Sequence, residues 1–285
     1  TPRAITPAAP PRPTPAAKGH RITRLSVTDV EKLVRDPYAI YAKRILGLTA
    51  LDAIGATPGP AERGTAVHDA LYKFQKAGNL DPAILLKLLE AELIGAGFSS
   101  ERRTAYLARV EDTAAAFAAW ARERNESKFA PLYEISGSLD LGSAELSCRA
   151  DRIDRRPDGR AEIIDYKTGQ PPSNDMVSSG FAPQLLLEAA MLEEGGFKDA
   201  KPTTVEALIY WRFGARSPFE RPVKAEGAVH EAARDALTEL KALLAKYDTP
   251  AQPFLSRPRV QFLDDYGDYD HLARRHEWAD LGGGE

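Results

Sequence analysis

The stretch CRADRIDRRPDGRAEIIDYKTG, residues 148–169, decides the fold of this chain. It reads as two strands joined by a tight turn at Pro157–Gly159, because Pro presets φ and Gly tolerates a positive φ. Two acids, Asp151 and Asp165, are therefore expected on paired strands. A lysine, Lys167, stands two residues beyond the second acid.

The alternation of side chains along a strand gives this pair of strands a charged face. Asp165 and Lys167 point to one side together with Ile163, whereas Ile164 points to the other side. The second strand thus reads as buried on both sides, where unpaired charges are costly.

If Asp151 comes alongside Asp165, the two carboxylates repel by about 4 kcal/mol at a separation of about 4 Å and an effective dielectric near 20. A divalent cation removes that repulsion, so the pattern predicts a metal site beside Lys167. The same repulsion predicts that Asp165→Ala stabilises the metal-free fold. The alternative is a surface ion pair between Asp165 and Lys167 on a solvated hairpin.

These residues resemble the pattern of the PD-(D/E)XK nucleases, with Asp151 as the first acid and Asp165-Tyr166-Lys167 as the (D/E)XK. Upstream, Gly64–Leu71 is similar to the GxxxHxxL helix of RecB-type nucleases. Downstream, Pro183–Ala190 is similar to the Gln-containing motif of that group.

Both ends of the chain extend the resemblance, which covers residues from about 24 to 279. The run SVTDVEKLVRDPYAIYAKRILGL (Ser26–Leu48) looks like the first helix pair of these nucleases. The run YGDYDHLARRHEW (Tyr266–Trp278) is similar to the C-terminus of proteobacterial AddB proteins, the helicase–nuclease subunits of double-strand break repair.

The resemblance implies an α/β fold: a PD-(D/E)XK restriction-endonuclease-like core, with a mixed central sheet flanked by helices, inside a helical shell. It implies a metal-dependent deoxyribonuclease, of exonuclease type, that works in an AddAB-type complex on double-strand DNA ends. The expected partners are a single-stranded DNA end and an AddA-like helicase–nuclease subunit. Two alternatives stay open: a stand-alone RecB-like exonuclease, and a catalytically idle DNA-binding or scaffold domain of the same fold.

The metal ligands follow from residue type and from the resemblance. Mg²⁺ takes one or two carboxylates with substrate phosphate oxygens, so Asp151 and Asp165 are predicted to bind Mg²⁺ or Mn²⁺. The resemblance adds the backbone carbonyl of Tyr166 and the imidazole of His68, which suits Mn²⁺. The alternative for this histidine is a core position. Lys167 is expected to orient the attacking water or to offset charge on the phosphorane.

Gln184 is the predicted catalytic residue outside the two strands. It opens a helix after Pro183, where its amide and the free backbone N–H groups are placed to meet a phosphate. The alternative for Gln184 is helix capping. Glu188 stands where the family often has Tyr, which leaves its role open. Glu134 is either the acid that often precedes the first strand in this group or a surface charge.

Arg63, Arg149 and Arg152 border the proposed site in sequence and are, with Gln184, the predicted phosphate contacts. The net charge of −3 provides no overall basic field. DNA binding must therefore come from a local patch, and we expect the isolated domain, as a monomer, to bind single-stranded DNA weakly.

Composition is that of an ordinary globular protein: 285 residues, 28% charged and 43% hydrophobic. No apolar run approaches the roughly 20 residues of a membrane span, and no signal peptide is visible, so a cytoplasmic protein without membrane association is expected. Many relatives carry four cysteines for an iron–sulfur cluster, but this chain has only Cys148, so no such cluster is expected. Packing of the C-terminal segment is predicted to replace it, through Tyr266, Tyr269, Leu272 and Trp278.

The predicted domain organisation has three parts. Residues 1–23 are rich in Pro and Ala and read as a linker or tail, which suggests an excised C-terminal piece of a longer protein. Residues 24–279 form the nuclease domain, and residues 280–285 form a frayed end. Strands are predicted at 132–141, 144–155, 160–167 and 203–213, and helices around His68 and at 81–95, 100–125, 182–194 and 227–247.

Overall fold

The computed structural model describes residues 9–14, 21–49, 51, 55–214, 219–225, 227–263 and 265–278. These residues group into two compact units, which are described separately. Unit 1 comprises residues 1–52, 140–147 and 237–285, and unit 2 comprises residues 53–139 and 148–236. The predicted nuclease domain spans both. The predicted tail lies partly, and the predicted frayed end wholly, outside the described residues.

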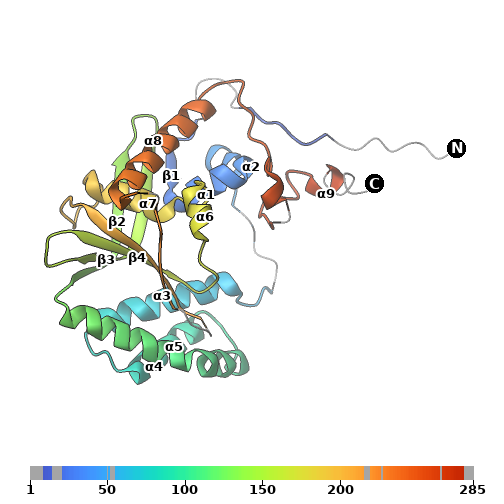
Figure 1. The fold of residues 1–285 in the computed structure, drawn as a ribbon. Helices are drawn as coiled ribbons and strands as arrows, with labels where there is room; N and C mark the ends of the chain where they lie inside the picture. The colour runs from blue at the N-terminus through green and yellow to red at the C-terminus, as the bar shows by residue number, and fades with distance from the viewer. Residues whose placement is uncertain are drawn as a thin grey trace. The chain divides into compact units, whose positions relative to one another are not determined.

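Three helices form a layer in unit 2: α3 (Pro60–Ala77), α4 (Pro82–Gly95) and α5 (Ser100–Glu126) (Figure 1). Proline begins α3 and α4, where its missing N–H is not needed. Asp81 caps α4 by accepting from the Ala83 amide at 2.9 Å. Gly78, with φ of 71°, ends α3. The layer carries His68 on its middle turns and presents apolar side chains to the sheet.

The central sheet is mixed, as the α/β prediction requires. Its strands in unit 2 are β2 (Ala130–Asp140), β3 (Glu145–Arg155), β4 (Ala161–Lys167), β5 (Val205–Arg212) and β6 (Glu220–Pro222). The last residue of β2 and the part of β3 before Cys148 belong to unit 1. Strand β3 pairs antiparallel with β4, and β4 pairs parallel with β5. Gly159 has φ of 87° in the turn between β3 and β4, as the sequence predicts.

Helices cover β4 and β5 on both faces. One face packs on the helical layer, where the Phe117 ring of α5 lies edge-on to the rings of Trp211 and Tyr166. The distances between ring centroids are 4.8 Å to Trp211 and 5.5 Å to Tyr166. Ile164 and Ile209 belong to the same buried cluster. Helix α7 (Gln184–Glu193) lies against β4 and β5 from the other face, and the short α6 (Asn174–Ser178) precedes it (Figure 1). Strand β4, which carries Asp165 and Lys167, is therefore buried on both sides, as expected from the sequence.

Unit 1 contains β1 (Arg24–Ser26), α1 (Val27–Arg35), α2 (Pro37–Ile40), a π-helical turn (Tyr41–Ile45), a 3₁₀ turn (Val260–Phe262) and α9 (Arg275–Trp278). Helix α8 (Val229–Tyr247) begins in unit 2 and ends in unit 1. Ser26 and Asp29 form a reciprocal cap at the start of α1. The helix then breaks at Asp36, before Pro37, which begins α2.

The predicted packing of the C-terminal segment is only partly right. Tyr269 is buried with Tyr38 and Ala273, and its hydroxyl donates to the Leu48 carbonyl at 2.7 Å. The Trp278 indole donates to the Ala273 carbonyl at 2.8 Å. The expectation is wrong for Tyr266, which is 90% exposed and buries little apolar area, whereas Leu272 is 37% exposed and only partly covered.

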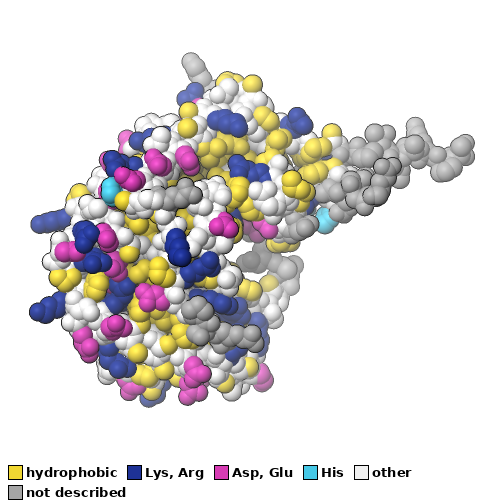
Figure 2. Space-filling model, viewed as in Figure 1, with side chains coloured by type: hydrophobic (Ala, Val, Ile, Leu, Met, Phe, Trp, Pro, Cys, Tyr) yellow, Lys and Arg dark blue, Asp and Glu magenta, His cyan; other side chains and the backbone are white. Residues whose placement is uncertain are grey.

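The predicted helices and strands of unit 2 match the observed ones closely, but its short β6 and α6 were not predicted, and neither was β1 of unit 1. Acidic and basic side chains are interspersed over the face seen in Figure 2. Among the described residues, no helix is both long enough and apolar enough to cross a membrane.

Candidate active site

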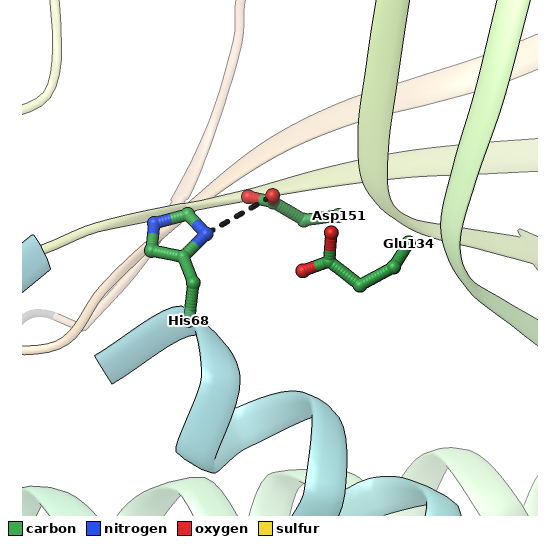
Figure 3. A group of neighbouring side chains, drawn as sticks. All are labelled: His68, Glu134 and Asp151. Atoms are coloured by element: carbon green, nitrogen blue, oxygen red, sulfur yellow. Dashed lines mark hydrogen bonds and ion pairs between the residues drawn. The ribbon is translucent and has the colours of Figure 1, made fainter. Parts of the chain in front are cut away.

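Three side chains from separate elements of unit 2 converge beside the β3–β4 pair: His68 of α3, Glu134 of β2 and Asp151 of β3 (Figure 3). One potential ligand atom from each lies within 4.8 Å of the other two. The His68 Nδ1 lies 3.1 Å from the Asp151 Oδ1. Figure 3 shows the Glu134 carboxylate pointing toward this pair.

The backbone fixes two of these side chains. The Tyr166 amide donates to the Asp151 Oδ2 at 2.7 Å, which ties the first acid to the second strand. Glu134 has φ of 52° within β2, a left-handed conformation that costs a non-glycine residue about 1–2 kcal/mol. Such strain persists where the surrounding structure enforces it, and it is concentrated at functional sites.

The second acid and the lysine form a separate group with Gln184. The Lys167 ammonium lies 3.0 Å and 2.9 Å from the two Asp165 oxygens and donates to the Gln184 Oε1 at 3.0 Å. The Gln184 amide nitrogen donates to the Asp165 Oδ1 at 2.7 Å and to the Glu188 Oε1 at 3.1 Å. Gln184 therefore uses both ends of its amide to hold Asp165 and Lys167 in place.

The Lys167 contact bears on one sequence-based expectation, that Asp165→Ala stabilises the metal-free fold by relieving repulsion between carboxylates. In the structure, Asp165 is also paired with Lys167, so its removal relieves that repulsion and breaks an ion pair at the same time. The net change in stability stays a prediction.

The carboxylates of the site outnumber the cations beside them, and this imbalance shifts the pKa of several groups. Burial alone would lower the pKa of His68, but the hydrogen bond and charge of Asp151 and the charge of Asp165 raise it to about 9. Burial raises the pKa of Asp165 despite the Lys167 ammonium. Burial and the nearby Asp165 charge raise the pKa of Glu188 well above its ordinary value. In the metal-free protein an imidazolium thus balances the carboxylates.

The opposite face of β3 and β4 holds a different polar network, and it corrects one prediction. Arg152 is 0% exposed, so it cannot contact a DNA phosphate as expected. Its guanidinium donates to the Asp154 Oδ1 at 2.6 Å and to the Gln75 Oε1 at 2.8 Å. The Tyr166 hydroxyl donates to the same Gln75 oxygen at 2.8 Å. Alternation along β3 explains the error, because Arg152 points away from Asp151.

Among the other predicted phosphate contacts, Gln184 is buried, and the two remaining arginines lie nearer the surface. Arg149 is 63% exposed, and its Nε lies 2.7 Å from the Glu134 Oε2, at the edge of the converging carboxylates. Arg63 of α3 is half-buried and lies over the Tyr106 ring. These two positions remain open to solvent, and their contact with DNA stays a prediction.

Two participants had no firm role from the sequence. Glu134 lies with His68 and Asp151, from within β2 rather than before it, which favours a place at the site over an isolated surface charge. Glu188 supports Gln184. The spacing of four residues between Gln184 and Glu188 places both on one helix face and was the available signal.

The donor set fits a divalent cation. Carboxylate oxygens are the ligands of Mg²⁺, and an imidazole nitrogen suits Mn²⁺. Glu134, Asp151 and His68 each present a donor atom, and the imidazole must lose its proton before it binds a metal. Asp165 lies next to this group but is bound to Lys167. Whether it and the Tyr166 carbonyl are ligands stays a prediction.

Comparison with known proteins identifies the class. The sequence profile of the PD-(D/E)XK nuclease superfamily matches residues 24–258, so the chain belongs to this superfamily. Two relatives are uncharacterized proteins of Rickettsia. The one from Rickettsia felis is 32% identical over 207 residues, 67% of this chain and 24% of the relative. The one from Rickettsia typhi is 33% identical over 219 residues, 69% of this chain and 25% of the relative. The chain thus spans about a quarter of these curated relatives.

One solved structure with a similar course of the chain is a "Putative exonuclease" from Eubacterium rectale. It is 8% identical, with a TM-score of 0.45, and the match covers 86% of this chain and 88% of that chain.

Proposed function

We propose that this chain is a divalent-metal-dependent deoxyribonuclease that hydrolyses phosphodiester bonds of a single DNA strand. One observation carries the proposal: His68, Glu134 and Asp151 converge within 4.8 Å, beside an Asp165–Lys167 pair held by Gln184. Neither the three converging donors nor the Asp165–Lys167 pair alone indicates hydrolysis. Together they supply ligands for a cation and a positioned ammonium.

The residues divide the work. Glu134, Asp151 and His68 would hold Mg²⁺ or Mn²⁺, with Asp165 and the Tyr166 carbonyl as further ligands. When bound, the ion polarises a phosphoryl oxygen and makes water a competent nucleophile near neutral pH.

The Lys167 ammonium supplies a second positive charge, which stabilises negative charge that develops on the phosphate. Gln184 fixes that ammonium through its carbonyl oxygen. Glu188 in turn fixes the Gln184 amide.

The larger setting we propose is an AddAB-type helicase–nuclease that processes double-strand DNA ends for recombinational repair. The similarity of residues 266–278 to AddB C-termini supports it, as does the greater length of the relatives. The chain has no G-x-x-x-x-G-K-[ST] motif, so ATP hydrolysis would come from elsewhere, such as an AddA-like partner. A catalytically idle scaffold is disfavoured, because it would not need the strained Glu134 or the Gln184-held lysine.

The direct test is cleavage of an end-labelled single-stranded oligonucleotide in Mg²⁺ or Mn²⁺. We expect cleavage by the wild-type chain and none by Asp165→Asn, which keeps the shape of the side chain. Asp158→Asn is the matched control, because Asp158 lies in the exposed turn between the same strands and should leave the activity unchanged. Cleavage that survives Asp165→Asn, or a wild-type chain that is inactive with both metals, would refute the proposal.

A further inference from the structure

A small basic hollow lies in the helical layer of unit 2, apart from the metal ligands. Its volume is about 210 Å³, and α3, α4 and α5 line it. Three arginines reach it: Arg63 from the first turns of α3, and Arg102 and Arg109 from the first half of α5. Apolar side chains form the remaining wall, namely Leu93, Phe98, Ala105 and Tyr106.

Aromatic rings hold the guanidinium groups in place. Arg63 and Arg109 both lie over the Tyr106 ring, at 5.5 Å and 5.3 Å from its centroid. Arg102 lies 4.9 Å from the Phe98 ring centroid. A guanidinium that lies over a ring keeps its N–H groups free at the edge of its own plane, where the planar fork can bind an anion.

The three arginines form no ion pair with a carboxylate of the described residues. The acids next to them in sequence are engaged at helix N-termini: Glu62 accepts from the Gly59 amide at 2.6 Å, and Glu101 is hydrogen-bonded by its own backbone and by Ser99. The hairpin between β3 and β4 differs, because Arg156 and Arg160 each pair with a carboxylate there. The hollow thus concentrates positive charge that no acid in the described part of the chain pairs with.

The hollow and the active site share helix α3. Arg63 precedes His68 by five residues, about 7.5 Å along the helix axis and about 140° around it. A Cβ on the neighbouring Gly64 would lie 3.6 Å from the Thr168 Oγ1, and Thr168 directly follows Lys167. The first turns of α3 therefore pass beside the end of β4 that carries the lysine.

We propose that Arg63, Arg102 and Arg109 form a phosphate-binding site for the DNA strand that enters the active site. This inference rests on the proposed function and adds the path of the substrate. Guanidinium groups bind phosphate oxygens through paired N–H donors, which fix a strand without reading its sequence. The shared chemistry is a phosphate group, internal or terminal, of a single strand.

The test compares two double variants that remove the same charge. Arg102→Gln with Arg109→Gln changes the hollow, and Gln keeps the helix propensity of α5. Arg155→Gln with Arg160→Gln is the matched control on the β3–β4 hairpin, at the opposite end of β4 from Lys167. Both are made in an Asp165→Asn background with Mg²⁺, and fluorescence anisotropy measures binding of a single-stranded oligonucleotide across a salt series.

We expect the hollow variant to bind at least tenfold more weakly than the control. The slope of the logarithm of the binding constant against the logarithm of the salt concentration should become shallower by about 0.7 for each phosphate contact that the variant loses. Each phosphate that is neutralised on a single strand contributes about that amount. Equal affinities and slopes for the two double variants would overturn the proposal.

Two oligonucleotides, with and without a 5′-phosphate, distinguish the source of the phosphate. If the hollow variant loses affinity for both oligonucleotides, the site binds internal phosphates. If it loses affinity only for the phosphorylated one, the site binds the terminal phosphate.

Failure of this proposal is separable from failure of the proposed function. A chain that cleaves DNA while the hollow variant binds like the control loses only the phosphate site. A chain that cleaves nothing while the hollow variant loses affinity keeps the site and loses the nuclease.

Discussion

The two faces of the β3–β4 pair carry charges of opposite character. On the face toward the helical layer, Arg152 and Arg124 are matched by Asp154 and Glu162 in a buried network. On the other face, acids converge with fewer cations, and protons make up part of the balance: Glu134, Asp151, Asp165 and Glu188 against His68, Lys167 and the exposed Arg149.

The difference separates structure from function within the same two strands. Buried ions that pair with one another require no bound cation, and loss of one partner leaves an uncompensated charge. Acids that crowd together without enough internal cations are stable only with a bound positive charge or a proton. Neighbouring residues of one strand, such as Asp151 and Arg152, therefore play unrelated roles.

The largest expected effect is on the balanced face. Arg152→Met should lower the free energy of unfolding by about 3 kcal/mol, the lower end of the range for a broken buried pair, because Arg124 still contacts Asp154. Chemical denaturation measures it. Arg160→Met, a change of an exposed arginine on the same hairpin, should leave the free energy of unfolding nearly unchanged. Equal losses for the two variants would contradict the assignment of the network as a buried structural element.

The next effect is on the site face. Lys167→Met should lower the rate of DNA cleavage by about 10²–10³, because it removes a positioned positive charge. Mn²⁺ affinity should not fall, since the change frees Asp165 from its ion pair and leaves more negative charge near the metal. Single-turnover kinetics and calorimetric titration measure the two quantities. A loss of Mn²⁺ binding together with activity would show that the lysine organises the metal site.

The smallest effect concerns the strained acid. Glu134→Gly and Glu134→Ala both remove the carboxylate, but only glycine relaxes the left-handed backbone. The glycine variant should be more stable than the alanine variant by about 1 kcal/mol, while both weaken Mn²⁺ binding equally. Thermal unfolding of the pair, each with and without metal, checks this. If alanine were as stable as glycine, the φ of 52° would carry no strain.

Local sequence signals were sufficient for the hairpin that decides the fold. The turn residues at Pro157–Gly159 and the period-two pattern of Asp165 and Lys167 predicted the strands, the face of each acid and the burial on both sides. The mixed sheet flanked by helices followed the family resemblance, and the structure confirms it.

What the sequence missed depends on contacts across the chain. Arg152 was expected at the surface because it neighbours Asp151, and only the pairing with Gln75 and Asp154 shows that it is buried. Glu134 reaches the site through a single irregular φ in β2, which no propensity indicates. Tyr266 was expected to pack within the C-terminal segment that replaces the cluster, but it is 90% exposed.

The most direct test of the central claim is a Mn²⁺ titration of the wild-type chain and of Asp151→Asn, followed by calorimetry. The account predicts that Mn²⁺ binds the wild-type chain and that the substitution weakens binding at least tenfold, because one of the three converging donors is lost. Asp158→Asn, an equal loss of charge at the exposed turn, should bind like the wild type. Equal Mn²⁺ affinity in the wild type and Asp151→Asn, or no binding to the wild type, would contradict a metal centre on this face of the sheet.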